Sequence, residues 1–99
     1  MIPEDDRGFT LGDGLFETIL SRGGLLMHAE AHLARMAAGC AVLGLPAPDA
    51  SDILEEAEAA LAASRLSGAR AAVRVTWTAG SGGRGLDRPA ILEPRLIVT

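Results

Sequence analysis

The sequence predicts an α+β domain in which two helices pack on a mostly antiparallel sheet, in the order ββααββ. Apolar and polar residues alternate strictly over 69–79, which is typical of a half-buried strand. Apolar residues recur every three or four positions over 29–43 and again after Asp49, which is typical of amphipathic helices. Because several connections between these segments are short, neighbouring strands are expected to pair as hairpins.

The composition predicts one small domain with a thin core. A chain of 99 residues buries somewhat over ~60% of its unfolded surface, and no interior boundary divides residues 1–99. The hydrophobic fraction is 48%, but only 3% of the residues are aromatic and alanine supplies much of the apolar content. We therefore expect the domain to depend on a second surface for its stability.

The first two strands are expected to form a hairpin. A strand over 15–21 precedes Gly23 and Gly24, which suit a tight turn, and 25–27 forms the return strand. Residues 1–11 are polar and contain a proline and a glycine, so we expect turns there.

The ends of the two predicted helices and the inner faces of the helices and the following strand can be assigned from the sequence. The helix over 29–43 stops at Gly44, and the second begins at Asp49 and ends at Ser67-Gly68. A final strand is expected over 95–99. The inner faces are Leu33, Met36, Cys40 and Leu43 in the first helix, Ile53, Leu54, Ala57 and Leu61 in the second, and Ala71, Val73, Val75 and Trp77 in the strand after it.

Charge and composition exclude several function classes. The net charge is −4 and no cluster of basic residues occurs, so nucleic acids and acidic membranes are not expected partners. No apolar run approaches ~18 residues, and the N-terminus does not resemble a signal peptide. A single cysteine, Cys40, has no internal disulfide partner, which favours a cytoplasmic location. The two histidines and one cysteine do not have metal-ligand spacing, and Asp5-Asp6 is expected to be solvated.

The most informative segments are Asp6-Arg7-Gly8, Gly12-Asp13-Gly14-Leu15-Phe16-Glu17-Thr18 and His32-Leu33-Ala34-Arg35. Together, and at these separations, they resemble the opening signature of the class IV aminotransferases. These pyridoxal-5′-phosphate (PLP) enzymes include branched-chain and D-amino-acid aminotransferases and aminodeoxychorismate lyase. The resemblance covers essentially the whole chain and corresponds to the small N-terminal domain of this fold type. The family's usual first strand and its larger C-terminal domain have no counterpart, and the chain stops within an apolar strand, which indicates a fragment.

The resemblance implies that Arg35 contacts the PLP phosphate. His32 and Arg35 are three residues apart and so project from one helical face, where a guanidinium can present several donors to a phosphate. On spacing alone, a solvated surface arginine is the alternative. A structural hydrogen bond is the expected role of His32.

Substrate contacts are implied at three residues. Phe16 and Thr18 are expected on one face of their strand, with Glu17 and Ile19 on the other. The resemblance makes Phe16 and Thr18 candidate pocket residues; the alternative is ordinary packing of a core strand. The loop 80–85 either is a flexible hairpin loop or, as its similarity to aminodeoxychorismate lyase implies, brings Arg84 to a substrate carboxylate.

The chain contains no lysine, the residue whose amine holds PLP covalently. We therefore name no catalytic residue and expect these 99 residues alone to be inactive. The resemblance implies the N-terminal part of a homodimeric enzyme that acts on a small amino-acid-like substrate, converting 4-amino-4-deoxychorismate to 4-aminobenzoate and pyruvate. Two alternatives remain open: an aminotransferase for branched-chain or D-amino acids, and a non-catalytic binding or dimerisation module.

Overall fold

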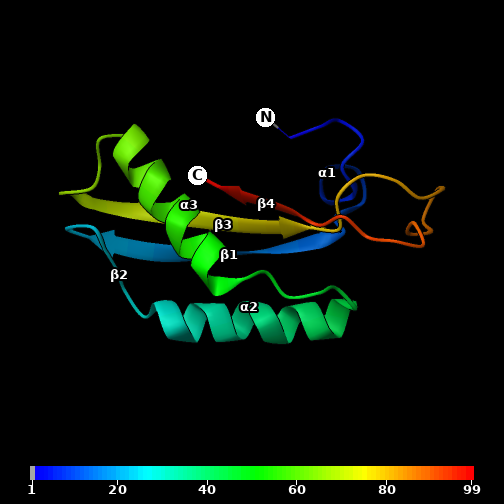
Figure 1. The fold of residues 1–99 in the computed structure, drawn as a ribbon, viewed down its shortest axis with the longest axis horizontal. Coiled ribbons are helices and arrows are strands. Elements are labelled where there is room, and N and C mark those ends of the chain that lie inside the picture. The colour runs from blue at the N-terminus through cyan, green and yellow to red at the C-terminus, as the bar shows by residue number, and fades with distance from the viewer. Residues whose placement is uncertain (1) are drawn as a thin grey trace.

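The computed structural model describes residues 2–99 and contains a single four-stranded sheet with three helices (Figure 1). The α+β class, the antiparallel sheet and the order of the predicted elements are confirmed, and one helix was not predicted. The elements in chain order are α1 (Arg7–Leu11), β1 (Gly14–Arg22), β2 (Leu25–Leu26), α2 (Ala29–Leu43), α3 (Ala50–Ala63), β3 (Arg70–Thr78) and β4 (Arg95–Val98).

The sheet is built around one long antiparallel pair. Its strand order is β2-β1-β3-β4, and β1 pairs with β3 from Gly14 opposite Thr78 to Arg22 opposite Arg70. The turn between β1 and β2 has positive φ angles at both glycines, 59° at Gly23 and 82° at Gly24, as a tight two-residue hairpin requires. Strand β2 pairs only with Ser21 and Arg22, the last two residues of β1. Most of one edge of β1 therefore has no strand partner among the described residues.

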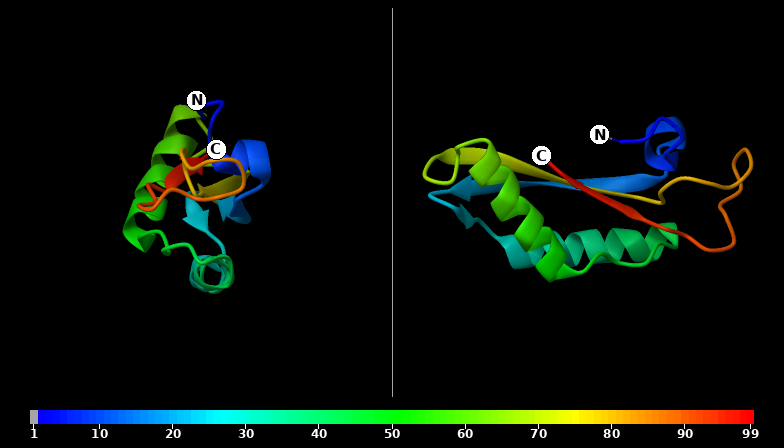
Figure 2. Two further views of the ribbon diagram at one scale, coloured as in Figure 1. Left: turned by 90° about the vertical axis from the view of Figure 1, so that its right-hand side faces the viewer. Right: turned by 45° about the horizontal axis from the view of Figure 1, so that its top comes forward.

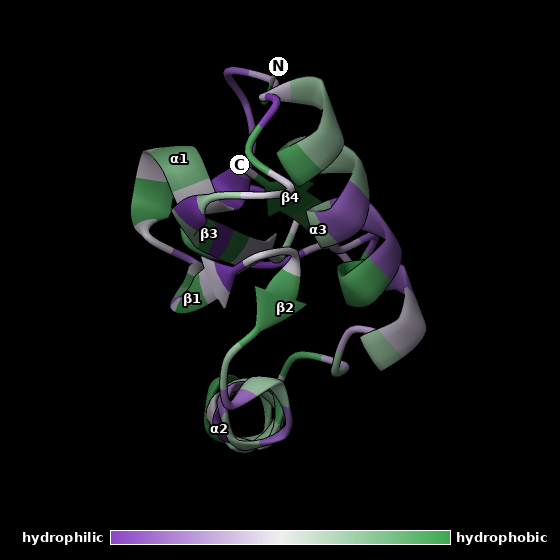
Figure 3. Ribbon diagram, turned by 90° about the vertical axis from the view of Figure 1, so that its left-hand side faces the viewer, coloured by the Kyte–Doolittle hydropathy of each residue, from purple (hydrophilic) through white to green (hydrophobic). Residues whose placement is uncertain are grey.

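The two long helices cover one face of the sheet (Figures 1 and 2). Helix α2 runs along β1, whereas α3 crosses the sheet and contacts β3 and β4. The short apolar strand β2 lies beside the start of α2 and the inner side of α3 (Figure 3). Buried apolar residues from the sheet and both helices form one core, which consists of Ile19, Met36, Cys40, Leu45, Ile53, Ala57, Leu61, Val73, Val75 and Ala79.

The predicted inner faces are largely confirmed. Burial of Cys40 raises the pKa of its thiol, as expected of an inert core cysteine. Leu54 was wrongly assigned to the core, because α3 buries only the narrow stripe Ile53, Ala57 and Leu61 and leaves Leu54 44% exposed. Leu43, at the end of α2, is 39% exposed.

Helix α1 contradicts the expectation of turns alone before residue 12. The Asp6 carboxylate accepts hydrogen bonds from the backbone N–H groups of Gly8 and Phe9, which is a helix N-cap. Gly12 closes the helix with φ 67° in the left-handed region. Both cap residues were visible in the sequence, but a helix of one turn has too few positions to show a period. The second predicted helix also ends earlier than expected, at Ala63.

None of the helices within residues 2–99 has both the length and the apolar character needed to cross a membrane.

Candidate functional site

Strand β1 separates the predicted site residues onto two faces of the sheet. As predicted, Phe16 and Thr18 lie on one face, and Glu17 and Ile19 on the other. Glu17 and Ile19 are buried under the helices, whereas Phe16 is 55% exposed. Phe16 is therefore not an ordinary core residue, and its aromatic ring is available to a ligand.

The open face is hollowed beside Phe16. Phe16, Thr76 and Thr78 line a depression of about 340 Å³, together with residues of α1 and the Gly12–Gly14 bend. The guanidinium carbon of Arg74 lies 4.0 Å from the centroid of the Phe16 ring, which is cation–π distance. Thr18 pairs with Arg74 in the sheet but does not line this depression.

Arg74 is a site candidate that the sequence argument missed. The alternation over 69–79 is sufficient to place Arg74 on the polar face of its strand, but its partner there depends on the register between β1 and β3. Arg74 is exposed and forms no ion pair with any residue from 2 to 99. A guanidinium over an aromatic ring in a hollow can receive a planar molecule that carries a carboxylate.

Arg35 reaches from α2 to the buried side of β1. Its Nε donates to Glu17 Oε1 at 2.5 Å and its Nη2 donates to Glu17 Oε2 at 2.7 Å, a side-on bidentate pair. The Arg35 side chain is nevertheless 71% exposed, and Ala31, His32 and Arg35 line a small surface depression. Arg35 is therefore held against β1, not free in solvent.

The electrostatics of this pair favour both ions in their charged forms. The hydrogen bonds from Arg35 lower the pKa of Glu17, against the opposing effect of burial, and Glu17 raises the pKa of Arg35. His32 Nδ1 lies 3.7 Å from Glu17 Oε2 and makes no hydrogen bond with the described residues. The expected structural hydrogen bond of His32 is therefore not made through Nδ1.

Arg84 lies in the segment between β3 and β4. It is exposed, and it does not line the hollow beside Phe16. The backbone of Arg84 pairs with that of Asp87 in a local bridge. The structure thus places Phe16 with Arg74, Arg35 with Glu17, and Arg84 in neither group.

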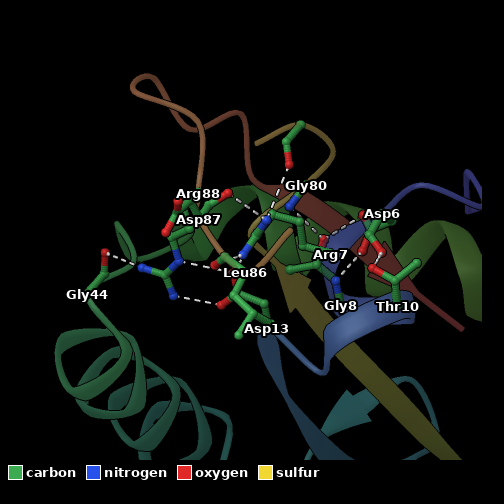
Figure 4. A network of polar contacts seen from close by, with 12 residues as sticks. Asp6, Arg7, Gly8, Thr10, Asp13, Gly44, Gly80, Leu86, Asp87 and Arg88 are labelled. Atoms are coloured by element: carbon green, nitrogen blue, oxygen red, sulfur yellow. Dashed lines mark hydrogen bonds and ion pairs between the residues drawn. The ribbon is translucent and has the colours of Figure 1, made fainter. Parts of the chain in front are cut away.

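The loop that carries Arg84 is tied down by a buried arginine, Arg7 (Figure 4). Arg7 is 4% exposed and donates to Asp13 Oδ2 at 2.9 Å. It also donates to three loop carbonyl oxygens: Leu86 at 2.8 Å, Asp87 at 3.0 Å and Gly82 at 3.3 Å. Within residues 80–85, these side-chain contacts fix one backbone oxygen, that of Gly82.

Asp13 and Asp6 complete this network. Arg88 holds Asp13 from the other side, and the hydrogen bonds from Arg88 and Arg7 lower the pKa of Asp13. Asp6 is fully buried and accepts hydrogen bonds from Thr78 Oγ1 at 2.8 Å and Arg95 Nη1 at 2.5 Å. The expectation that Asp6 is solvated was wrong, because both of these partners are more than 70 residues away in sequence.

The Asp6-Arg7-Gly8 motif is therefore structural in this fold. A Cβ added to Gly8 would lie 2.4 Å from Thr78 Cγ2, so a glycine lets α1 approach β3 closely. Within residues 2–99, no group of three or more His, Cys, Asp or Glu side chains is placed to hold a metal ion.

Comparisons with known proteins agree with this fold and these motifs. The sequence profile described as amino-transferase class IV matches residues 14–99. The chain belongs to the class IV aminotransferase family, as the resemblance predicted.

Two of the similar proteins are aminodeoxychorismate lyases. The chain is 34% identical to the aminodeoxychorismate lyase of Vibrio harveyi over 98 residues, which is 99% of this chain and 35% of that protein. It superposes on the crystal structure of 4-amino-4-deoxychorismate lyase from Pseudomonas aeruginosa with a TM-score of 0.83 and 37% identity, over 100% of this chain and 35% of that one.

A second solved structure is the PLP-bound form of a hypothetical aminotransferase from Mycobacterium tuberculosis. The TM-score is 0.77 and the identity 28%, over 100% of this chain and 34% of that chain. The chain thus spans about a third of the length of the relatives it matches.

Proposed function

We propose that this chain forms the N-terminal domain of a PLP-dependent enzyme that converts 4-amino-4-deoxychorismate to 4-aminobenzoate and pyruvate. The proposal rests on the similarity to two aminodeoxychorismate lyases over almost the whole chain. The structural observation that carries it is Arg35, an exposed guanidinium fixed against the strand that also bears Phe16.

Arg35 fits the phosphate of PLP. A guanidinium has five N–H donors, and Glu17 occupies only two of them. The remaining N–H groups are free to bind phosphate oxygens. When bound, PLP acts as an electron sink for bond cleavage at the amino-bearing carbon of a substrate. The amine that anchors it must come from residues outside these 99, since the chain contains no lysine.

Phe16, Thr18 and Arg74 are our proposed substrate contacts, with Arg84 as a fourth. The substrate is a cyclic molecule with carboxylates, which suits an aromatic surface beside a guanidinium. Arg35 and Phe16 lie on opposite faces of β1, but the edge of β1 before Ser21 is not paired with β2. We propose that the ligand lies along this edge and contacts both faces.

The test uses the protein expressed from its complete gene. With PLP and 4-amino-4-deoxychorismate, we expect release of 4-aminobenzoate and pyruvate. In parallel reactions, D-alanine or leucine is supplied with 2-oxoglutarate. Amino transfer without 4-aminobenzoate would reject the lyase and favour the aminotransferase, which the Mycobacterium tuberculosis neighbour supports.

The third possibility, a non-catalytic module, has a separate test. If the complete gene product binds no PLP and catalyses neither reaction, the enzyme proposal fails. We also propose a cytoplasmic homodimer. Light scattering of the complete protein measures its mass in solution, and a mass of one chain would contradict the dimer.

A further inference from the structure

Glu17 is a buried carboxylate whose role the family resemblance does not specify. It is 7% exposed and lies on the covered face of β1, between Leu15 and Ile19. Burying a carboxylate among apolar residues is unfavourable unless a cation and hydrogen bonds compensate. Arg35 supplies both through a bidentate pair that links α2 to β1, and His32 Nδ1 of the same helix lies 3.7 Å from Glu17 Oε2.

The geometry of the pair is asymmetric. Glu17 is buried, but the Arg35 side chain is 71% exposed. Glu17 engages the Nε and Nη2 atoms, that is, one edge of the planar guanidinium. The other N–H groups, on Nη1 and Nη2, make no hydrogen bond with the described residues. An arginine left to itself at a surface samples many rotamers, whereas this one is held by a rigid strand.

We propose that Glu17 is a positioning residue for the cofactor phosphate. By gripping one edge of Arg35, it fixes the orientation in which the remaining N–H groups meet phosphate oxygens. This inference rests on the proposed function, since it takes Arg35 as the phosphate ligand. Preorganisation of this kind strengthens binding because less side-chain entropy is lost when the ligand arrives.

Simple electrostatics predicts the opposite effect, which makes the proposal testable. Glu17 carries a negative charge close to the expected phosphate, so its neutralisation should by charge alone strengthen phosphate binding. If Glu17 acts by positioning, neutralisation should weaken it. The sign of the effect therefore separates the two accounts.

The experiment measures the affinity of the complete gene product for PLP and for pyridoxal, which lacks the phosphate. We expect Glu17→Gln to weaken PLP binding by roughly tenfold, the size typical of removing a residue that orients a ligand. Pyridoxal binding should stay unchanged. Glu30→Gln is the matched control, because Glu30 is an exposed acid in the first turn of α2, the helix that carries Arg35, and should leave both affinities unchanged.

Arg35→Met and the double variant complete the design. Arg35→Met should weaken PLP binding and not pyridoxal binding, and adding Glu17→Gln should then have no further effect. If Arg35→Met leaves PLP affinity intact, the proposed role of Arg35 itself fails. If Arg35→Met weakens PLP binding but Glu17→Gln leaves it equal or stronger, only the positioning proposal is overturned.

A folding defect is distinguished by two further measurements. Glu17→Asp keeps the charge but withdraws the carboxylate by one methylene, so we expect the same selective loss of PLP affinity. Thermal melts of every variant without cofactor show whether the fold persists. Parallel losses of PLP and pyridoxal binding in both Glu17 variants would contradict the proposal and indicate a purely structural role.

Discussion

Phe16 and Glu17 are neighbours in sequence, yet β1 gives them opposite environments. Glu17 points under α2, where Arg35 compensates its charge, and Phe16 points to the open face, where Arg74 lies over its ring. Strand alternation was sufficient to predict this separation. The cationic partner of each side chain, 18 residues from Glu17 and 58 from Phe16, was not predictable in the same way.

At the residue scale, Glu17 should make stability depend on acid pH. Its pKa is lowered from the ordinary value of 4.5 by Arg35, so the folded state binds that proton less readily than the unfolded chain. The stabilisation is complete above pH 4.5 and is lost as the pH falls through the folded-state pKa. Urea unfolding of the complete protein should show a smaller decline below pH 4.5 for Glu17→Gln than for the wild type. A parallel decline in the two proteins would contradict this contribution.

At the element scale, strand β1 contributes both to the core and to the proposed site. Ile19 is fully buried on the same strand whose opposite face exposes Phe16. Helix α1, which ends at Gly12, contacts the segment that follows β3. Its Arg7 side chain donates hydrogen bonds to backbone carbonyl oxygens of that segment. Helix α1 is therefore more a support for this loop than part of the core.

Substitutions on the two faces of β1 should have different consequences. Ile19→Ala removes fully buried atoms and should cost about 2–5 kcal/mol of unfolding free energy. Phe16→Ala should change stability by less than ~1 kcal/mol but raise the KM for substrate. Denaturant unfolding and steady-state kinetics of the complete protein measure both. Unchanged kinetics in Phe16→Ala would remove Phe16 from the substrate site.

Loss of the hydrogen bonds from the Arg7 guanidinium should make the loop between β3 and β4 more mobile. Arg7→Lys keeps the charge but cannot reach Asp13 and three carbonyl oxygens together, so about 1–3 kcal/mol of stability should be lost. Hydrogen exchange should accelerate most over residues 82–87, and trypsin should cut more rapidly after Arg84. Arg22→Lys, at the exposed end of β1, is the control and should change neither. Uniform acceleration across the sheet would instead indicate global destabilisation.

On the scale of the whole molecule, the two faces of the sheet are covered unequally. The two long helices cover one face, and within residues 2–99 only the short helix α1 packs at one end of the other. The molecule is elongated, with extents of 44 × 26 × 18 Å. Large apolar side chains remain exposed at the open face, at α1 and in the loop before β4, namely Phe9, Phe16, Leu86 and Ile91. We expect this exposed apolar surface to be covered by further protein.

The isolated 99-residue chain should therefore be marginally stable or associate. We expect a broad melt at low temperature, or oligomers in light scattering at micromolar concentration, whereas the complete gene product should melt cooperatively at a higher temperature. The control is the same chain with Leu86 and Ile91 replaced by serine, which should associate less. A sharp melt of the unaltered chain as a monomer at high temperature would contradict the expectation.

The sequence by itself determined the α+β class, six of the seven elements to within a few residues, and the alternation that places Phe16 and Glu17 on opposite faces of their strand. These follow from local rules, since periodicity, caps and glycine turns act over a few residues. Only the tertiary structure decided that Asp6 and Arg7 are buried and that Arg74 lies over Phe16. It also decided that Glu17 forms a bidentate ion pair with Arg35. A side chain's partner across the sheet depends on strand register and helix placement, and residues far apart in sequence set both.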